Sequence, residues 1–97
     1  MNGNGNHAAA IARLDKLAEE LGNSGLDAWL MDPPGRVPSV YITNPRARAL
    51  EENVYADQGK DGLWWFWWSW AERIAPADDL TASVAKIARV LSLPRRA

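Results

Sequence analysis

Residues that could carry out catalysis are few and scattered along this chain. It has no cysteine and a single histidine, His7, which lies in a polar N-terminal segment. A lone histidine without cysteine or acidic neighbours is a weak metal signal, and a serine such as Ser69 needs an adjacent base before it can act as a nucleophile. The sequence therefore predicts a protein that is not an enzyme, uses no cofactor and holds no metal ion.

The acidic side chains form no catalytic or ligand-binding pattern either. Half of them come as neighbouring pairs: Glu19/Glu20, Glu51/Glu52 and Asp78/Asp79. Such pairs are typical of solvated faces and helix starts rather than of catalytic carboxylates. Asp57 and Asp61 lack the regular ligand spacing of a calcium loop, and the Asn-Gly-Asn-Gly-Asn run near the N-terminus follows no strand, as a phosphate-binding loop would. These observations exclude the common metal and nucleotide motifs.

The most informative feature of the sequence is an aromatic stretch, residues 63–70 (LWWFWWSW). It contains five of the six tryptophans and the only phenylalanine, and the turn signal Asp61-Gly62 precedes it. Aromatic side chains suit a pleated, half-buried surface, so this stretch is predicted to be a strand. Because side chains alternate between the two faces of a strand, Trp64, Phe66, Trp68 and Trp70 share one face, and Leu63, Trp65, Trp67 and Ser69 share the other.

Three further strands are predicted before the aromatic stretch, at residues 26–31, 37–43 and 53–57. Residues 46–51 (RARALE) fit either a helical turn or a loop. Apolar residues at helical spacing predict one helix over 8–21 and another from a cap at Asp78 or Asp79 to about Leu91, with Gly22 ending the first. The expected fold is therefore α+β, with a four-stranded antiparallel meander between an N-terminal and a C-terminal helix (α-β-β-β-β-α).

Length and charge limit the organisation of the chain. Ninety-seven residues form one domain, expected over 8–94, with tails at 1–7 and 95–97 that have little to bury. The net charge of −1 and the pI near 5.7 argue against sequence-independent electrostatic binding of nucleic acid. No apolar run is long enough to span a membrane, and the N-terminus does not resemble a signal peptide, so a cytoplasmic location is expected.

Alternation places at least one aromatic from every predicted strand on a common sheet face: Trp29, Tyr41, Tyr55, Trp65 and Trp67. Two interpretations follow. Helices on both sides of the sheet would bury these side chains as core. Alternatively, they form an exposed contact face for a second copy of the chain, for another protein, or for a planar or sugar-like small ligand. Binding of single-stranded nucleic acid is a weaker alternative, with Arg36, Arg46, Arg48 and Lys60 bordering the sheet.

Two segments also carry a resemblance. Residues 38–45 (PSVYITNP) and 61–70 (DGLWWFWWSW), followed by the helix that begins at Asp78-Asp79, resemble a family of small uncharacterised actinobacterial proteins. The likeness spans about residues 14–91. It implies a bacterial cytoplasmic protein near regulatory or biosynthetic genes, and it brings no catalytic residues with it.

Overall fold

A computed structural model describes residues 2–92 of the chain, with side chains from Asn6 onward. The elements follow in the order α1 (Asn2–Asn23), β1 (Asp27–Met31), β2 (Ser39–Asn44), β3 (Ala47–Gln58), β4 (Trp64–Trp68), β5 (Arg73–Pro76) and α2 (Leu80–Val90). The strands lie side by side in sequence order, and each neighbouring pair is antiparallel. The α+β class and the meander are confirmed, but the expected count of four strands is wrong, because the sheet has five.

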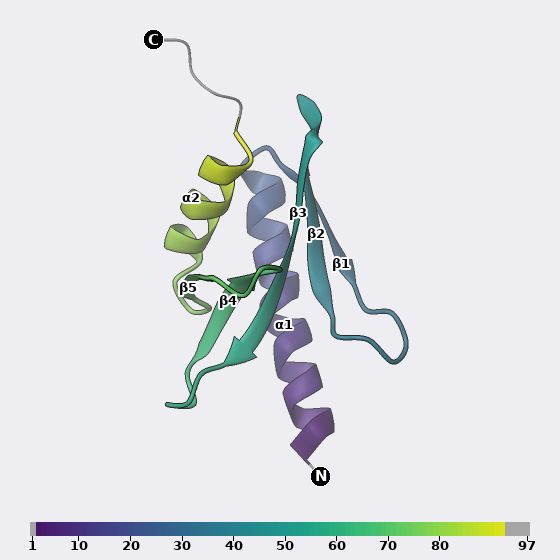
Figure 1. Ribbon diagram of the computed structural model, residues 1–97, viewed down its shortest axis with the longest axis vertical. Coiled ribbons are helices and arrows are strands. Elements are labelled where there is room, and N and C mark those ends of the chain that lie inside the picture. The colour runs from purple at the N-terminus through teal and green to yellow at the C-terminus, as the bar shows by residue number, and fades with distance from the viewer. Residues whose placement is uncertain (1, 93–97) are drawn as a thin grey trace.

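Both helices lie on one face of the sheet and share a single core with it (Figure 1). The stripe of α1 that enters this core recurs every three or four residues, which is the spacing of one helix face. Its members are Ala10, Leu14, Leu17 and Leu21. From the sheet, the fully buried side chains are Val40, Ile42, Val54, Phe66 and Ile74, and from α2 and its C-terminal end they are Ile87 and Leu91. The opposite face of the sheet has no helix over it.

The end of α1 is set by Gly25 rather than by Gly22, which the sequence suggested. Gly25 has φ of +100°, a left-handed conformation that glycine adopts without a Cβ penalty. The Leu26 amide donates to the Leu21 carbonyl at 3.1 Å, and the Gly25 amide donates to the Gly22 carbonyl at 3.2 Å. This pair of bonds is a Schellman motif, and the contact between two buried leucines, Leu21 and Leu26, accompanies it. The motif turns the chain directly into β1.

The start of α1 also differs from expectation. The helix begins at Asn2, so it includes most of the segment 1–7 that was expected to be a disordered tail. Once a helix is nucleated, each added residue gains one backbone hydrogen bond, which allows a polar segment to continue it. The expected tail at 95–97 and the last two residues of the expected domain, 93–94, lie outside the described residues.

Residues 47–51 of the ambiguous segment 46–51 belong to a strand, and Arg46 lies in the turn before it. They form the first part of β3, which is 12 residues long, and β3 extends beyond its neighbours in Figure 1. The register with β2 shifts between Thr43 and Asn44, where Asn44 pairs with Ala47. Segment 46–51 contains three charged residues and no regular apolar alternation, so the usual strand signal is absent from the sequence.

The fifth strand was missed because its turn carries no turn-forming sequence. β4 ends at Trp68, and the chain reverses through residues 69–71 into β5. The Ala71 amide donates to the Trp68 carbonyl at 3.0 Å, and the Trp68 amide donates to the Glu72 carbonyl at 2.8 Å. This is a three-residue hairpin whose last position is left-handed, with Ala71 at φ of +68°. Glycine or asparagine normally occupies that position, so an alanine there gives no signal.

The second helix begins and ends as the sequence predicts. Asp79 caps it, since its Oδ1 accepts a hydrogen bond from the Ala82 amide at 3.0 Å. At the other end, buried Asn44 donates from Nδ2 to the Leu91 carbonyl at 2.7 Å, which ties the last turn of α2 to the end of β2. No helix among residues 2–92 is long and apolar enough to cross a membrane.

Ala71→Gly is expected to stabilise the protein. The left-handed conformation costs an L-residue about 1 kcal/mol or more, a cost that glycine does not carry. Part of this gain is lost because glycine is freer in the unfolded chain, so the net increase in the free energy of unfolding should be about 0.5–1 kcal/mol. Urea denaturation followed by circular dichroism measures it.

The matched control is Ala49→Gly, the same substitution at an exposed residue inside β3. Ala49 has no positive φ, so glycine there adds only unfolded-state entropy and should destabilise the protein by about 0.5–1 kcal/mol. Equal destabilisation by the two substitutions would contradict the hairpin geometry at Ala71.

Candidate functional site

The five aromatic side chains singled out in the sequence all lie on the sheet face that no helix covers. Four of them alternate along their strands with buried core residues, as Tyr41 does between Val40 and Ile42, and Trp67 between Phe66 and Trp68. Trp29 alternates with Ala28 and Leu30, which are partly buried and pack against the core. We call this set the aromatic face; it consists of Trp29, Tyr41, Tyr55, Trp65 and Trp67. Trp29 is 46% exposed and the other four are partly buried. The interpretation that helices on both sides of the sheet bury these residues is wrong.

Trp29 and Tyr41 form the first group of the aromatic face. They are directly opposite each other on β1 and β2, and their rings stack with centroids 5.7 Å apart and an interplanar angle of 27°. Aromatic pairs at this distance in an offset arrangement attract each other beyond the area that they bury. The stacking holds Trp29 in place on an edge strand although almost half of its surface is open to water.

Polar contacts surround this first group. The hydroxyl of Tyr41 donates a hydrogen bond to the carboxylate of Glu51, and this bond holds the pKa of Tyr41 above its ordinary value of 10.0. The charge of Glu51 adds to the effect, whereas the charge of Arg48 opposes it. Arg48 Nη1 lies 3.2 Å from Asp27 Oδ2, so the charges at this end of the face are paired within the chain.

Tyr55, Trp65 and Trp67 form the second group of the aromatic face. Tyr55 is opposite Trp67 across β3 and β4. The guanidinium of Arg73, from β5, lies over both indoles, 4.5 Å from the Trp65 ring centroid and 5.3 Å from that of Trp67. Such cation–π contacts are worth roughly 0.5–1 kcal/mol at an exposed site. Arg73 thus sits where a ligand or a partner side chain would stack.

A shallow groove runs beside the second group. Its volume is about 660 Å³, and residues 57–61, at the end of β3 and in the β3–β4 loop, line it together with Trp67 and Arg73. The Trp67 indole nitrogen, Nε1, is buried and has no hydrogen-bond partner among the described residues. A buried donor without a partner costs free energy, which a ligand acceptor or a bound water would recover. This groove is the part of the face best suited to a small molecule.

Sequence reasoning missed Arg73, because the strand that carries it was not predicted. The remaining tryptophans lie off the aromatic face. Trp64 is on the helix side with the Arg13 guanidinium 4.8 Å from its ring centroid, and Trp68 stacks on Trp70 at 4.9 Å. Trp70 is not in the strand as expected, but in the β4–β5 turn, where its Nε1 donates to Glu72 Oε1 at 2.8 Å. Because these three tryptophans lie off the aromatic face, the candidate site consists of the five members of that face and Arg73.

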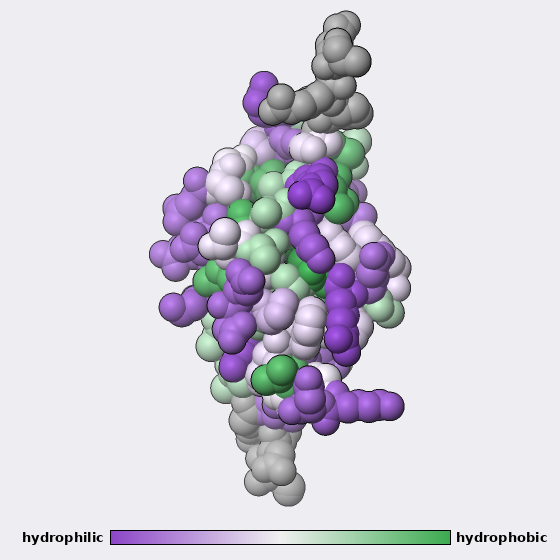
Figure 2. Space-filling model, turned by 90° about the vertical axis from the view of Figure 1, so that its left-hand side faces the viewer, coloured by the Kyte–Doolittle hydropathy of each residue, from purple (hydrophilic) through white to green (hydrophobic). Residues whose placement is uncertain are grey.

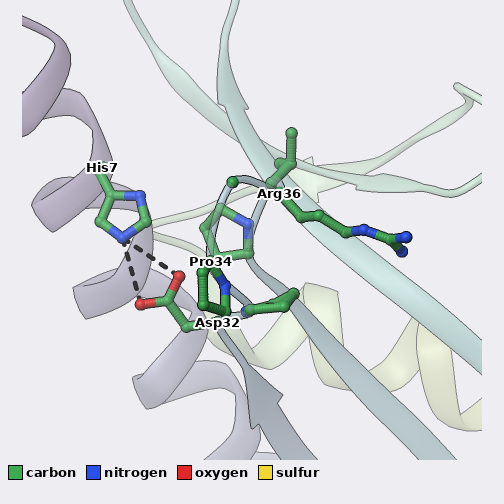
Figure 3. A pocket seen from close by; sticks show the side chains of 8 residues that line it. His7, Asp32, Pro34 and Arg36 are labelled. Carbon is green, nitrogen blue, oxygen red and sulfur yellow. Dashed lines mark hydrogen bonds and ion pairs between the residues drawn. The ribbon is translucent and has the colours of Figure 1, made fainter.

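A second hollow lies between α1 and the proline-rich β1–β2 loop. His7 Nε2 is 3.3 Å from both carboxylate oxygens of Asp32, so His7 contacts the loop instead of lying in a solvated tail. Figure 3 shows the His7 ring and the Asp32 carboxylate pointing toward each other, while the Arg36 guanidinium extends away from them. Because these groups do not converge on one point and lack a nucleophile, the contact ties α1 to the loop and forms no catalytic site.

The side of the molecule where α2 lies carries no large hydrophobic patch. Figure 2, which faces the side where α2 lies, shows hydrophobic atoms in small areas separated by hydrophilic side chains. Among the residues that the structure describes, no group of three or more His, Asp or Glu side chains could hold a metal ion. The aromatic face is therefore the leading candidate.

Comparisons with known proteins identify no relative whose function could be compared with this site. A scan against protein-family models gives no match, and neither does a search of curated proteins or of solved structures. The site is interpreted from its own geometry.

Glu51→Gln is expected to lower the pKa of Tyr41 toward 10.0. The substitution removes the carboxylate that accepts a hydrogen bond from the phenol hydroxyl, and with it the negative charge that disfavours a tyrosinate. Because the folded pKa is raised, the stabilisation from this bond is present below about pH 10 and is lost as the pH rises through the folded pKa. NMR titration of ¹³Cζ-labelled tyrosine measures the pKa directly.

Glu52→Gln is the matched control, since it removes the same charge one residue away. Glu52 is opposite Ile42 and so points to the helix side of the sheet. A shift of the Tyr41 titration in the Glu52 variant as large as in the Glu51 variant would show that the hydrogen bond to Glu51 is not the cause.

Proposed function

We propose that this protein is a non-enzymatic interaction module that uses the aromatic face to bind another protein, with a second copy of the chain as the first partner to test. The single observation that carries the proposal is that five aromatic side chains share a sheet face that no helix covers. A cytoplasmic bacterial setting, suggested by the motif resemblance, is part of the same proposal.

Energetic reasoning supports this choice. Each tryptophan can bury on the order of 200 Å², and buried Trp and Tyr side chains dominate the binding energy of many protein interfaces. Both groups of the face have their rings held in place, by Trp29–Tyr41 stacking and by Arg73 over Trp65 and Trp67. Side chains that are already ordered lose less conformational entropy on binding, so the face is well prepared for a contact.

Trp65→Ala combined with Trp67→Ala is expected to weaken self-association by about thirtyfold or more, because interface tryptophans commonly contribute 2 kcal/mol or more each. Sedimentation equilibrium over a hundredfold concentration range measures the association of wild type and variant. Trp70→Ala removes an exposed indole outside the aromatic face and serves as the control.

Two results would contradict the proposal. One is a wild type and a double variant that have the same mass at every concentration. The other is a monomeric wild type whose double variant unfolds, as judged by circular dichroism, because the indoles would then serve the stability of the fold.

The groove beside Trp67 favours a second candidate function, the binding of a small planar or sugar-like ligand. The Arg73 guanidinium, which makes no ion pair within 4.0 Å in the described part of the chain, offers donors to ligand oxygens. The unpartnered Nε1 of Trp67 is buried, so it becomes a donor to a ligand only when the indole shifts on binding. Carboxylate-bearing aromatic compounds fit this combination of stacking surface and donors.

Titration with a panel of aromatic carboxylates and monosaccharides is expected to change tryptophan fluorescence in the wild type. Arg73→Ala and Trp67→Phe should each weaken the response at least tenfold, since each removes one donor to the ligand. Arg89→Ala, at an exposed residue of α2, should leave it unchanged. A response that survives in both groove variants, or no response in the wild type, would exclude this ligand site.

A further inference from the structure

We propose that β1 is an edge at which two copies of this chain pair, antiparallel, about a two-fold axis through Trp29. The proposal rests on the self-association proposed above and adds a second contact to it, one that does not involve the indoles of Trp65 and Trp67 on β4 (the β4 indoles). It starts from the two edges of the sheet, β1 and β5, each of which has one neighbouring strand.

A strand with one neighbour leaves half of its backbone groups unpaired. In an antiparallel ladder, alternate residues exchange hydrogen bonds with the neighbour, and the residues between them point their N–H and C=O groups outward. Such an edge is a template for another strand, and proteins normally block it with short length, proline, charge or a bulge. The two edges of this sheet differ in those features.

The β5 edge carries all four blocking features. It is four residues long, it begins with charged Arg73 and ends with Pro76, and the register with β4 shifts between Phe66 and Trp67. Pro76 has no amide hydrogen to donate, and the register shift bends the strand away from a flat ladder. A further strand has little to pair with on this side.

The β1 edge carries almost none of them. Its sequence is Asp-Ala-Trp-Leu-Met, without proline or lysine, and its five residues pair with β2 in one unbroken register. Its single charge, Asp27, is at one end and forms an ion pair with Arg48 of the same chain. Trp29 and Met31 are each 46% exposed. Figure 1 shows β1 at the margin of the sheet with no further element beyond it.

Symmetry fixes the register of the pairing. Trp29 is the central residue of β1, so a two-fold axis there places Trp29 opposite its own copy and Asp27 opposite Met31 of the second copy. The two Asp27 carboxylates then lie at opposite ends of the ladder, about 14 Å apart along the strand, and do not repel strongly. Because β5 is blocked, the contact closes on itself and gives a dimer rather than a filament.

Pairing at β1 joins the two sheets into one, and the two aromatic faces become a single surface with a Trp29 pair at its centre. Two five-residue strands bury less than a standard interface of about 1,600 Å², so the dimer is expected to be weak and concentration-dependent. The β4 indoles are separated from the seam by β2 and β3, and they stay available to a different contact.

A charge exchange at the axis tests the proposal. Trp29→Lys and Trp29→Glu each place like charges directly opposite one another, and each should weaken the dimer at least tenfold. An equimolar mixture of the two variants should recover it, as a Lys–Glu heterodimer seen by native mass spectrometry and by sedimentation. Both variants lose the stacking on Tyr41, so recovery on mixing cannot come from stacking. Leu63→Lys adds the same charge at an exposed leucine away from β1 and should leave the dimer intact.

Repeating the exchange with Trp65→Ala and Trp67→Ala already in place separates the two proposed contacts. Recovery on mixing in that background supports edge pairing even if the β4 indoles make no contact. A wild type that is monomeric at all concentrations, single variants that dimerise like the wild type, or a mixture that forms no heterodimer would each overturn pairing at β1. Loss of association on removal of the β4 indoles, without recovery on mixing, would assign self-association to the face alone.

Discussion

Packing of α1 and α2 against one face of the sheet is the constraint on which the other features depend. The buried stripe of α1, with Leu14, Leu17 and Leu21, requires an apolar surface opposite it, and Val40, Ile42, Val54 and Phe66 supply that surface. Since the side-chain period of a strand is two, the same packing sends the intervening residues to the other side. A slip of one residue would turn an indole toward the helices in β1 or β4, and a tyrosine in β2 or β3, so the core fixes the aromatic face.

Aromatic side chains on an uncovered face are held by local contacts instead of by a core. Stacking holds Trp29, a hydrogen bond to Glu51 holds Tyr41, and the Arg73 guanidinium covers Trp65 and Trp67. The ring stacking and the cation–π contacts are each worth only about 1 kcal/mol, and a stronger partner could replace them. The surface is therefore ordered in the free protein, and the contacts within it are weak enough to exchange for those of a partner.

The parts of this structure that the sequence predicted are those with a strong local period. The apolar stripes of both helices, the cap at Asp79 and the alternation of β1, β2 and β4 are all local patterns, and each was found. The parts that were missed lack such a pattern. Segment 46–51 alternates charged with small residues, and the turn before β5 uses alanine at a left-handed position. Because β5 was missed, so was Arg73, the charged side chain that lies over Trp65 and Trp67.

The sequence by itself determined the class of fold and the membership of the aromatic face, because a period of two assigns Trp29, Tyr41, Tyr55, Trp65 and Trp67 to one side whatever the helices do. Only the tertiary structure decided that this side is uncovered, since both helices could have been divided between the two faces with the same local sequence. It also decided contacts between residues far apart in the chain, such as His7 with Asp32 and Asn44 with the Leu91 carbonyl. Such contacts depend on how packed elements meet in space, and no local pattern of residues records that.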